Sequence, residues 1–229
     1  MEQHHTVYLS SAYLAPVQYY CKLMAYDRAV IEQHDHYLKQ TYRNRCTIAA
    51  PDGPLALTVP TVKPDTPKCP LRDIRISDHG NWRHLHWNAL ESAYNHTPFF
   101  EYYKDDFRPF YEKKYDFLVD FNEALCRLVC SLIDLQPCME RSTEYRTSFA
   151  EGEDDFRERI HPKKDFLPDD PDFRPQPYYQ VFQDKLGFLP NLSIADLLFN
   201  MGLEARLVLR ASVVDDGAPA ETPAAANKP

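Results

Sequence analysis

Apolar positions in the first third of the chain alternate between strand and helix periods. Residues 6–10 form a short β-rich run. Four apolar side chains then recur at the spacing of one helical face: Val17, Tyr20, Leu23 and Met24. Pro16 suits the first turn of that helix, which we expect to reach residue 25. Because residues 29–32 are again short and apolar, this stretch predicts a β-α-β unit with parallel strands.

A β-hairpin is predicted next. Residues 41–50 carry aromatic and β-branched side chains that favour an extended strand. Pro51-Asp52-Gly53 signals a turn, and residues 55–59 return as the second strand. We expect the hairpin and the β-α-β unit to form one mixed sheet.

Beyond the hairpin the pattern becomes mostly helical and aromatic. Residues 72–77 alternate like another strand, and a helix is predicted from Trp82 to about residue 95 with Asn81 as its N-cap. Apolar residues between 117 and 133 recur every three or four positions, so we expect the principal core helix there. The predicted class is therefore α/β with a helical, aromatic-rich C-terminal half.

The end of the predicted fold carries helix-terminus signals. Ser193 and Asp196 match a capping box, so a short helix should begin at Ile194. Gly202 suits the left-handed residue that ends such a helix. We expect a single domain over residues 1–209 and a disordered Ala/Pro-rich tail over residues 210–229.

Charge is unevenly distributed. The 229 residues have a net charge of -8, and residues 151–172 hold nine acidic and four basic side chains. Such a run favours a solvated loop or a partly ordered flap. No basic run exceeds a dipeptide, which argues against nucleic acid or an anionic membrane as partner. The chain has no apolar stretch of membrane-spanning length and no signal-peptide pattern at its start, so we expect a cytoplasmic protein without membrane insertion.

Cysteine and histidine spacing gives little support for a metal. The six cysteines form no C-x-x-C pair, and we interpret them as reduced core residues. Two H-x-H pairs, at residues 34–36 and 84–86, have a spacing that a metal can use on a strand. A zinc site usually needs a third ligand at a defined spacing, and none is apparent. We therefore expect no metal site.

The strongest candidate for ligand binding is Arg43-Asn44-Arg45. In an extended strand both arginines point to the same side, where they would form a two-pronged clamp for a carboxylate or phosphate. Asn44 offers an amide to a sugar hydroxyl or a backbone group, and Lys39 and Tyr42 are expected to assist binding. The alternative is that the arginines belong to a structural ion-pair network.

His86 is the candidate general base. It shares the inner face of the helix predicted from Trp82, and the ordinary pKa of histidine suits proton transfer near neutral pH. The alternative is a core histidine hydrogen-bonded to a backbone carbonyl, since an inward-facing ring must find a partner in either case.

A series of short motifs runs from residue 6 to residue 203. They are Tyr13-Leu14, Tyr37-x-Lys39, Tyr42-Arg43-Asn44-Arg45 with Ile48, Gly53, Val59-Pro60, Trp82-x-x-x-His86, Ala93-Tyr94, Pro98-x-Phe100 and Asn191-Leu192-Ser193-x-x-Asp196-Leu197-Leu198-Phe199-Asn200-x-Gly202. In this order and spacing the chain resembles the WbqC-like family of bacterial proteins. One departure lies at residues 10–16, where the family often has Gln-Pro-x-Tyr-Leu-Pro and this chain has Ser-Ser-Ala-Tyr-Leu-Ala-Pro. Any contact made by that glutamine is changed or lost here.

The resemblance implies a setting in surface-polysaccharide and O-antigen biosynthesis. A cytoplasmic enzyme there would handle a nucleotide-linked sugar, an anionic small molecule whose diphosphate suits the clamp. Acyl or related group transfer onto a sugar amine or hydroxyl is the reaction class that we expect. The alternative is a non-enzymatic ligand-binding or assembly protein of the same pathway, with residues 151–172 contacting another enzyme. Neither a cofactor nor an oligomeric state follows from the sequence.

Overall fold

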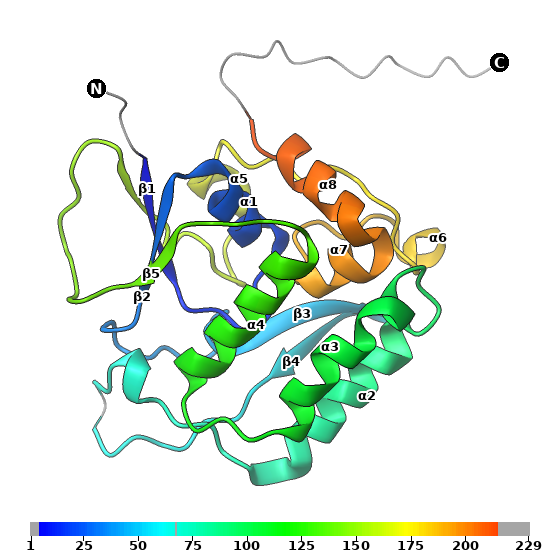
Figure 1. Ribbon diagram of the computed structural model, residues 1–229, viewed down its shortest axis with the longest axis horizontal. Coiled ribbons are helices and arrows are strands. Elements are labelled where there is room, and N and C mark those ends of the chain that lie inside the picture. Colours follow the sequence, from blue (N-terminus) through cyan, green and yellow to red (C-terminus); the bar gives the residue numbers. More distant parts are fainter. Residues whose placement is uncertain (1–4, 67, 215–229) are drawn as a thin grey trace.

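A four-stranded parallel sheet lies at one side of the molecule (Figure 1). The computed structural model describes residues 5–66 and 68–214. The strands are β1 (Thr6–Ser10), β2 (Arg28–Glu32), β5 (Met139–Arg141) and β6 (Glu153–Asp155), in the order β5-β2-β1-β6. α1 (Val17–Ala25) connects β1 to β2, which pair in parallel from Thr6 to Ser10. The predicted β-α-β unit is therefore confirmed.

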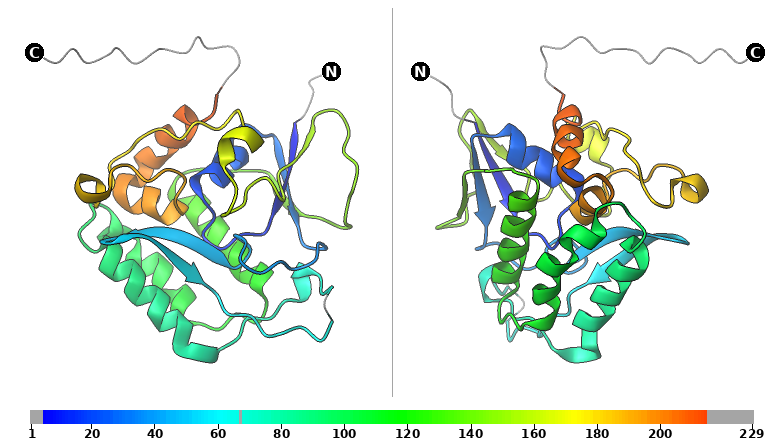
Figure 2. Two further views of the ribbon diagram at one scale, coloured as in Figure 1. Left: turned by 180° about the vertical axis from the view of Figure 1, so that it is seen from behind. Right: turned by 45° about the vertical axis from the view of Figure 1, so that its right-hand side comes forward.

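The predicted hairpin is also confirmed, but it forms a sheet of its own. β3 (Arg45–Ala50) pairs antiparallel with β4 (Gly53–Thr58). β3 contacts helices α2 and α7, and Figure 2 shows the hairpin lying between the α7–α8 and α2–α3 pairs. The α/β class is therefore confirmed, whereas the expected single mixed sheet is replaced by two separate sheets.

Helices build the rest of the molecule. The longer ones are α2 (Trp82–Tyr94), α3 (Phe100–Glu112), α4 (Leu118–Leu132), α7 (Ile194–Met201) and α8 (Ala205–Ala211). Short turns are η1 (Leu71–Asp73), η2 (His79–Asn81), α5 (Phe166–Asp169), α6 (Gln183–Leu186) and η3 (Gly202–Glu204). α7 contacts α1, α2, α3, α4, α8 and β3, and its residues 194–200 are all buried. Its Phe199 ring lies 5.0 Å from that of Phe100 and 5.1 Å from that of Phe107.

Two local predictions need correction. The strand expected at residues 72–77 is a 3-10 turn followed by single bridges, Thr61 to Ile76 and Arg75 to Phe117. Its alternating pattern arises because Ile74 and Ile76 are buried among loops and helices. The helix expected from Trp82 is confirmed, although Asn81 has a left-handed backbone and makes no side-chain capping bond.

The capping box at the start of α7 is half confirmed. The Ser193 hydroxyl accepts from the Ala195 N–H at 3.3 Å, as an N-cap should. Asp196 bonds to other side chains instead of returning to the cap. Its buried carboxylate accepts from Tyr94 at 2.9 Å, from Tyr178 at 2.7 Å and from Gln180 at 3.0 Å. Asp196 thereby joins α7 to α2 and to the segment before α6.

The acidic segment 151–172 is docked on the fold rather than free in solvent. It supplies strand β6 and the buried side chains of Arg157 and Asp170. The Asp170 carboxylate accepts from Lys22 at 2.6 Å and from Gln18 at 2.8 Å, both on α1. The expected flap is therefore wrong at Arg157 and Asp170, whose charges are neutralised by partners inside the protein, whereas Asp165 and Asp172 are exposed as in a solvated loop.

The ordered part of the chain also continues beyond residue 209. Ser212 is fully buried, and its carbonyl and hydroxyl accept from the backbone N–H groups of Arg174 at 2.9 Å and Gln176 at 3.0 Å. Residues 210–214 are thus described together with the fold, and the expected division into a domain over residues 1–209 and a tail over residues 210–229 stays a prediction. The rest of the expected tail, residues 215–229, lies outside the described residues.

Candidate functional site

A pocket is lined in part by α1, which leaves the carboxyl end of β1, and by the segment that leaves the carboxyl end of β6. In open α/β sheets ligands bind outside the carboxyl ends of strands, where neighbouring strands connect in opposite directions. The pocket has a volume of about 290 Å³ and lies between α1, the hairpin, the segment after β6 and the segment before α7. Its lining residues are Gln18, Tyr42, Thr47, Pro54, Arg159, His161, Pro162, Lys164, Phe166 and Leu189 to Leu192.

The basic side chains of this pocket are Arg159, His161 and Lys164. Arg159 packs over the ring of Phe156 at 4.9 Å, and no carboxylate of the described residues lies within ion-pair distance of it. Lys164 donates to the Glu158 carbonyl at 2.9 Å and lies 4.0 Å from the carboxylate of Asp169. These cations therefore keep donors for an anion from solution, in a protein whose net charge is negative.

Tyr42 contributes a neutral polar group to the same pocket. Burial raises the pKa of its phenol to about 12, so the hydroxyl stays protonated and can donate to a ligand. An apolar part of the lining comes from Phe166, Leu189 and Pro190. Apolar walls with a few placed polar groups are typical of small-molecule sites.

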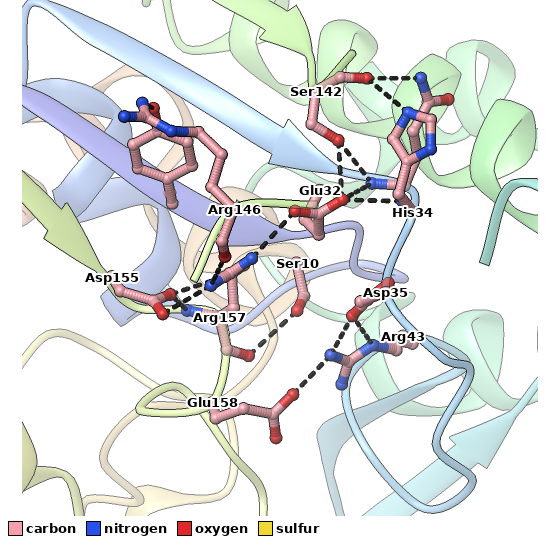
Figure 3. A network of polar contacts seen from close by, with 12 residues as sticks. Ser10, Glu32, His34, Asp35, Arg43, Ser142, Arg146, Asp155, Arg157 and Glu158 are labelled. Atoms are coloured by element: carbon pink, nitrogen blue, oxygen red, sulfur yellow. Dashed lines mark hydrogen bonds and ion pairs between the residues drawn. The ribbon is translucent and has the colours of Figure 1, made fainter. Parts of the chain in front are cut away.

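A buried ion-pair network supports this end of the sheet (Figure 3). Arg157 donates to both oxygens of Asp155 at 2.8 Å and to Glu32 at 3.0 Å. Glu32 is fully buried at the end of β2 and also accepts from Ser142 at 2.7 Å. The Ser10 hydroxyl at the end of β1 donates to the carbonyl of Arg157 at 3.0 Å. The network therefore ties together the strand ends from which the pocket segments depart.

Arg43 belongs to this network. Residues 41–44 form a turn rather than the start of the strand, so the extended geometry expected for 41–50 is wrong there. The Arg43 guanidinium is buried, donates from Nε and Nη2 to the same carboxylate oxygen of Asp35, and donates to Glu158 at 2.6 Å (Figure 3). Burial raises the pKa of Asp35 and Arg43 opposes this shift. These contacts favour the structural ion-pair interpretation of Arg43.

The other residues of the predicted clamp lie apart from Arg43. Arg45 is the first residue of β3 and donates to the Thr58 hydroxyl at 3.2 Å on the neighbouring strand. Asn44 is buried and donates to the Val59 carbonyl at 3.0 Å, which closes the open end of the hairpin. Lys39 is exposed in the preceding turn. Of the predicted binding residues, only Tyr42 lines the pocket.

His86 faces inward as predicted, at 5% exposure. Its Nδ1 lies 2.9 Å from the Tyr13 hydroxyl, which lies 2.9 Å from that of Tyr111, and the ring also bonds to the backbone of Thr58. Burial lowers the pKa of His86 to about 4, so the ring is neutral at neutral pH. His86 does not line the pocket. This environment favours a structural role, and its role as a base stays a prediction.

We predict that His86 makes the fold sensitive to acid. An unfolded histidine has its pKa near 6.5, so between about pH 6.5 and 4 only the unfolded chain gains a proton at this position. Stability should therefore fall through that window by up to about 3 kcal/mol. Glutamine at this position cannot titrate and should lower stability at pH 7.5 by about 1–3 kcal/mol.

Urea unfolding of wild type and His86→Gln at several pH values checks this. The difference in stability between the two proteins should shrink as the pH falls. A variant that is as stable as wild type at every pH, yet has lost activity, would instead identify His86 as a catalytic group.

Sequence reasoning did not find Arg159, His161 and Lys164. They sit within the acidic segment, where the excess of carboxylates indicated only a solvated loop. The signal that could have found them is the grouping of these three basic side chains within six residues. Within the described part of the chain, no helix combines the length and apolar character that a membrane span requires.

Comparisons with known proteins agree with the motif series. Residues 11–161 match the profile of the WbqC-like protein family. The chain is also similar to the uncharacterised protein Rv1507c of Mycobacterium tuberculosis, with 27% identity over 219 residues that cover 85% of this chain and 93% of that protein. No solved structure gives a significant match. The family match includes the segment up to His161, whereas the closing motif at residues 191–202 lies beyond it.

Proposed function

The chain belongs to the WbqC-like protein family, and on that premise we propose that it is a cytoplasmic enzyme acting on an anionic, nucleotide-linked sugar in surface-polysaccharide biosynthesis. The observation that supports this most is the pocket between α1, the hairpin and the segment after β6, with Arg159, His161, Lys164 and Tyr42 in its lining. A sugar phosphate needs cationic donors for its phosphate and an apolar surface for its ring, and this pocket offers both.

The proposed anion site lies at Arg159 and Lys164 instead of at Arg43 and Arg45. The Arg43 guanidinium already binds two carboxylates. Its contact with Glu158 instead fixes the segment that carries Arg159. We therefore propose that Arg43 positions the pocket, and that Arg159 and Lys164 bind the ligand. For the reaction we propose acyl or related group transfer onto an amine or hydroxyl of the bound sugar.

Ligand binding by paired variants tests this proposal. A uridine diphosphate-linked hexosamine should raise the melting temperature of the wild type, because it binds only the folded state. The Arg159→Ala/Lys164→Ala variant should bind it roughly 100-fold more weakly, since each charge-assisted bond contributes about 1.5 kcal/mol or more. The matched control is Lys104→Ala/Arg108→Ala, which removes two basic side chains of α3 outside the pocket lining.

Equal affinities in the wild type and the pocket variant would contradict this site. A group-transfer assay follows on the same proteins, with an acyl thioester as donor and thiol release as the readout. Turnover should require the sugar nucleotide and should fall in the pocket variant but not in the control.

The alternative, a non-enzymatic assembly protein, is favoured by one surface feature. Leu203 in η3 and Leu207 in α8 are 62% and 66% exposed and lie four residues apart. Exposed apolar side chains that gather in this way often mark protein contacts. Two results together would support this alternative: the protein binds the ligand without turnover, and a Leu203→Ser/Leu207→Ser variant no longer binds a partner protein of the same pathway.

A further inference from the structure

The three basic side chains of the pocket come from a single stretch of six residues. Arg159, His161 and Lys164 all follow β6, whereas the apolar and neutral polar lining comes mainly from α1, the hairpin and the segment before α7. The pocket therefore combines one cationic segment with a largely neutral remainder. That division matches a ligand with one strongly charged group and one neutral ring.

Hydrogen bonding fixes the proton on the His161 ring. The backbone N–H of Lys163 donates to Nδ1 of His161 at 3.1 Å. Nδ1 is therefore an acceptor, so the single proton of the neutral ring lies on Nε2. A base needs an unprotonated nitrogen directed at the substrate, and here the unprotonated nitrogen is occupied by the backbone. His161 is thus a hydrogen-bond donor to the pocket rather than a general base.

We propose that residues 159–164 form a phosphate subsite, in which the Nε2–H of His161 donates to a phosphate oxygen of the ligand beside Arg159 and Lys164. The sugar ring attached to this phosphate lies against Phe166, Leu189 and Pro190. This inference rests on the proposed function, because it places the charged group of the anionic ligand within the same pocket. It adds His161 as the residue that makes binding depend on pH.

The charges around His161 determine the direction of that dependence. Burial lowers the pKa of the ring, Glu158 raises it, and Lys164, Arg43 and Lys163 lower it. In the free protein at neutral pH the ring is therefore mostly neutral. A phosphate bound at Nε2 favours the imidazolium and raises the pKa of His161. The added proton goes to Nδ1, which then no longer accepts from the Lys163 N–H. By linkage, a bound anion that raises the pKa of the ring binds more strongly once acidification has protonated it.

Inorganic sulfate separates this effect from titration of the ligand, because sulfate remains a dianion between pH 8 and pH 5.5. Calorimetric affinities of wild type should rise severalfold over this range, and at most about tenfold, if bound sulfate raises the pKa of His161 by about one unit. His161→Gln keeps an N–H donor but cannot titrate, so its affinity should stay flat with pH. His84→Gln is the control, since His84 lies outside this pocket and bonds to Asn88 at 3.0 Å.

A second measurement needs no variant. The ¹⁵N chemical shifts of the His161 ring in ¹⁵N-histidine-labelled wild type should show that Nε2 is protonated at pH 8. The midpoint of the ring's titration should move up by about one pH unit with saturating sulfate. A hexose 1-phosphate should compete with sulfate, whereas the free hexose should not. Competition by the phosphate links the subsite to a sugar ligand.

The outcomes separate the two proposals. An unchanged His161 midpoint, or an equal rise in affinity in wild type and His161→Gln, overturns the role of His161 while the pocket remains the anion site. If wild type binds sulfate but no sugar phosphate displaces it, the protein holds an adventitious ion only and the subsite is rejected. If neither sulfate nor a sugar nucleotide binds at any pH, the proposed function fails together with this inference.

Discussion

Replacement of Arg157 by methionine should lower the free energy of unfolding by about 3–5 kcal/mol, because it leaves a buried carboxylate without its cationic partner. The Arg157 side chain is 6% exposed and Glu32 is fully buried, with Oε2 of Glu32 3.0 Å from the guanidinium. Methionine keeps most of the aliphatic stem and removes only the charge and the donors. Chemical denaturation at pH 7.5 measures this loss.

Three further variants separate the ion pair from general damage to the fold. Glu32→Gln and Glu32→Gln/Arg157→Met complete a double-mutant cycle with Arg157→Met, and the cycle should give a coupling energy of about 2 kcal/mol or more. Arg127→Met breaks an exposed pair with Glu123 and should cost less than about 1 kcal/mol. A loss below about 1 kcal/mol for Arg157→Met would contradict the network in Figure 3 as a structural support.

Gly202→Ala should be the second strongly destabilising change, by about 2–4 kcal/mol. Gly202 ends α7 with φ +58° and ψ -133°, which a residue with a Cβ adopts only under strain. A Cβ at this position would also lie 2.6 Å from the ring of Phe99. The melting temperature should therefore fall by several degrees, as thermal unfolding by circular dichroism can show.

Gly187 provides the matched control for this prediction. It has φ +71° and ψ -173°, yet a Cβ there would meet no atom within 4 Å. Gly187→Ala should therefore show only the backbone strain, about 1–2 kcal/mol. Shortening the neighbouring ring in Phe99→Ala/Gly202→Ala should remove the clash but not the strain. Equal losses for Gly187→Ala and Gly202→Ala would contradict a steric role for Phe99.

Local patterns predicted most of the regular elements correctly. The β-α-β unit, the hairpin, α2 and the start of α7 follow from short-range periodicity and terminus signals such as Ser193. The strand predicted at residues 72–77 is wrong because Ile74 and Ile76 are buried without belonging to a sheet. Separation of the hairpin from the parallel sheet depends on helix packing around β3, which no local pattern describes.

The candidate site was less accessible from the sequence, because its charges are partitioned by long-range contacts. Arg43 attracts attention as one of two closely spaced arginines, yet Asp35 and Glu158 occupy it. Arg159 lies in a segment that is acidic as a whole, yet it lines the pocket. Distant partners decide which arginine already binds a carboxylate and which remains available to a ligand. Arg43, for example, binds Glu158, which lies over 100 residues away in the chain. Composition and spacing cannot show that.

We propose that the ligand binds beside Arg159 and Lys164 rather than at Arg43 and Arg45. Hydrogen–deuterium exchange with and without a saturating uridine diphosphate-linked hexosamine tests it most directly, because it maps protection along the whole chain. Protection should concentrate in residues 159–166 and 189–192, which line the pocket, and exchange at residues 82–94 of α2 should be unchanged. Protection centred on residues 43–45 and on α2 around His86, with none in 159–166, would contradict the account.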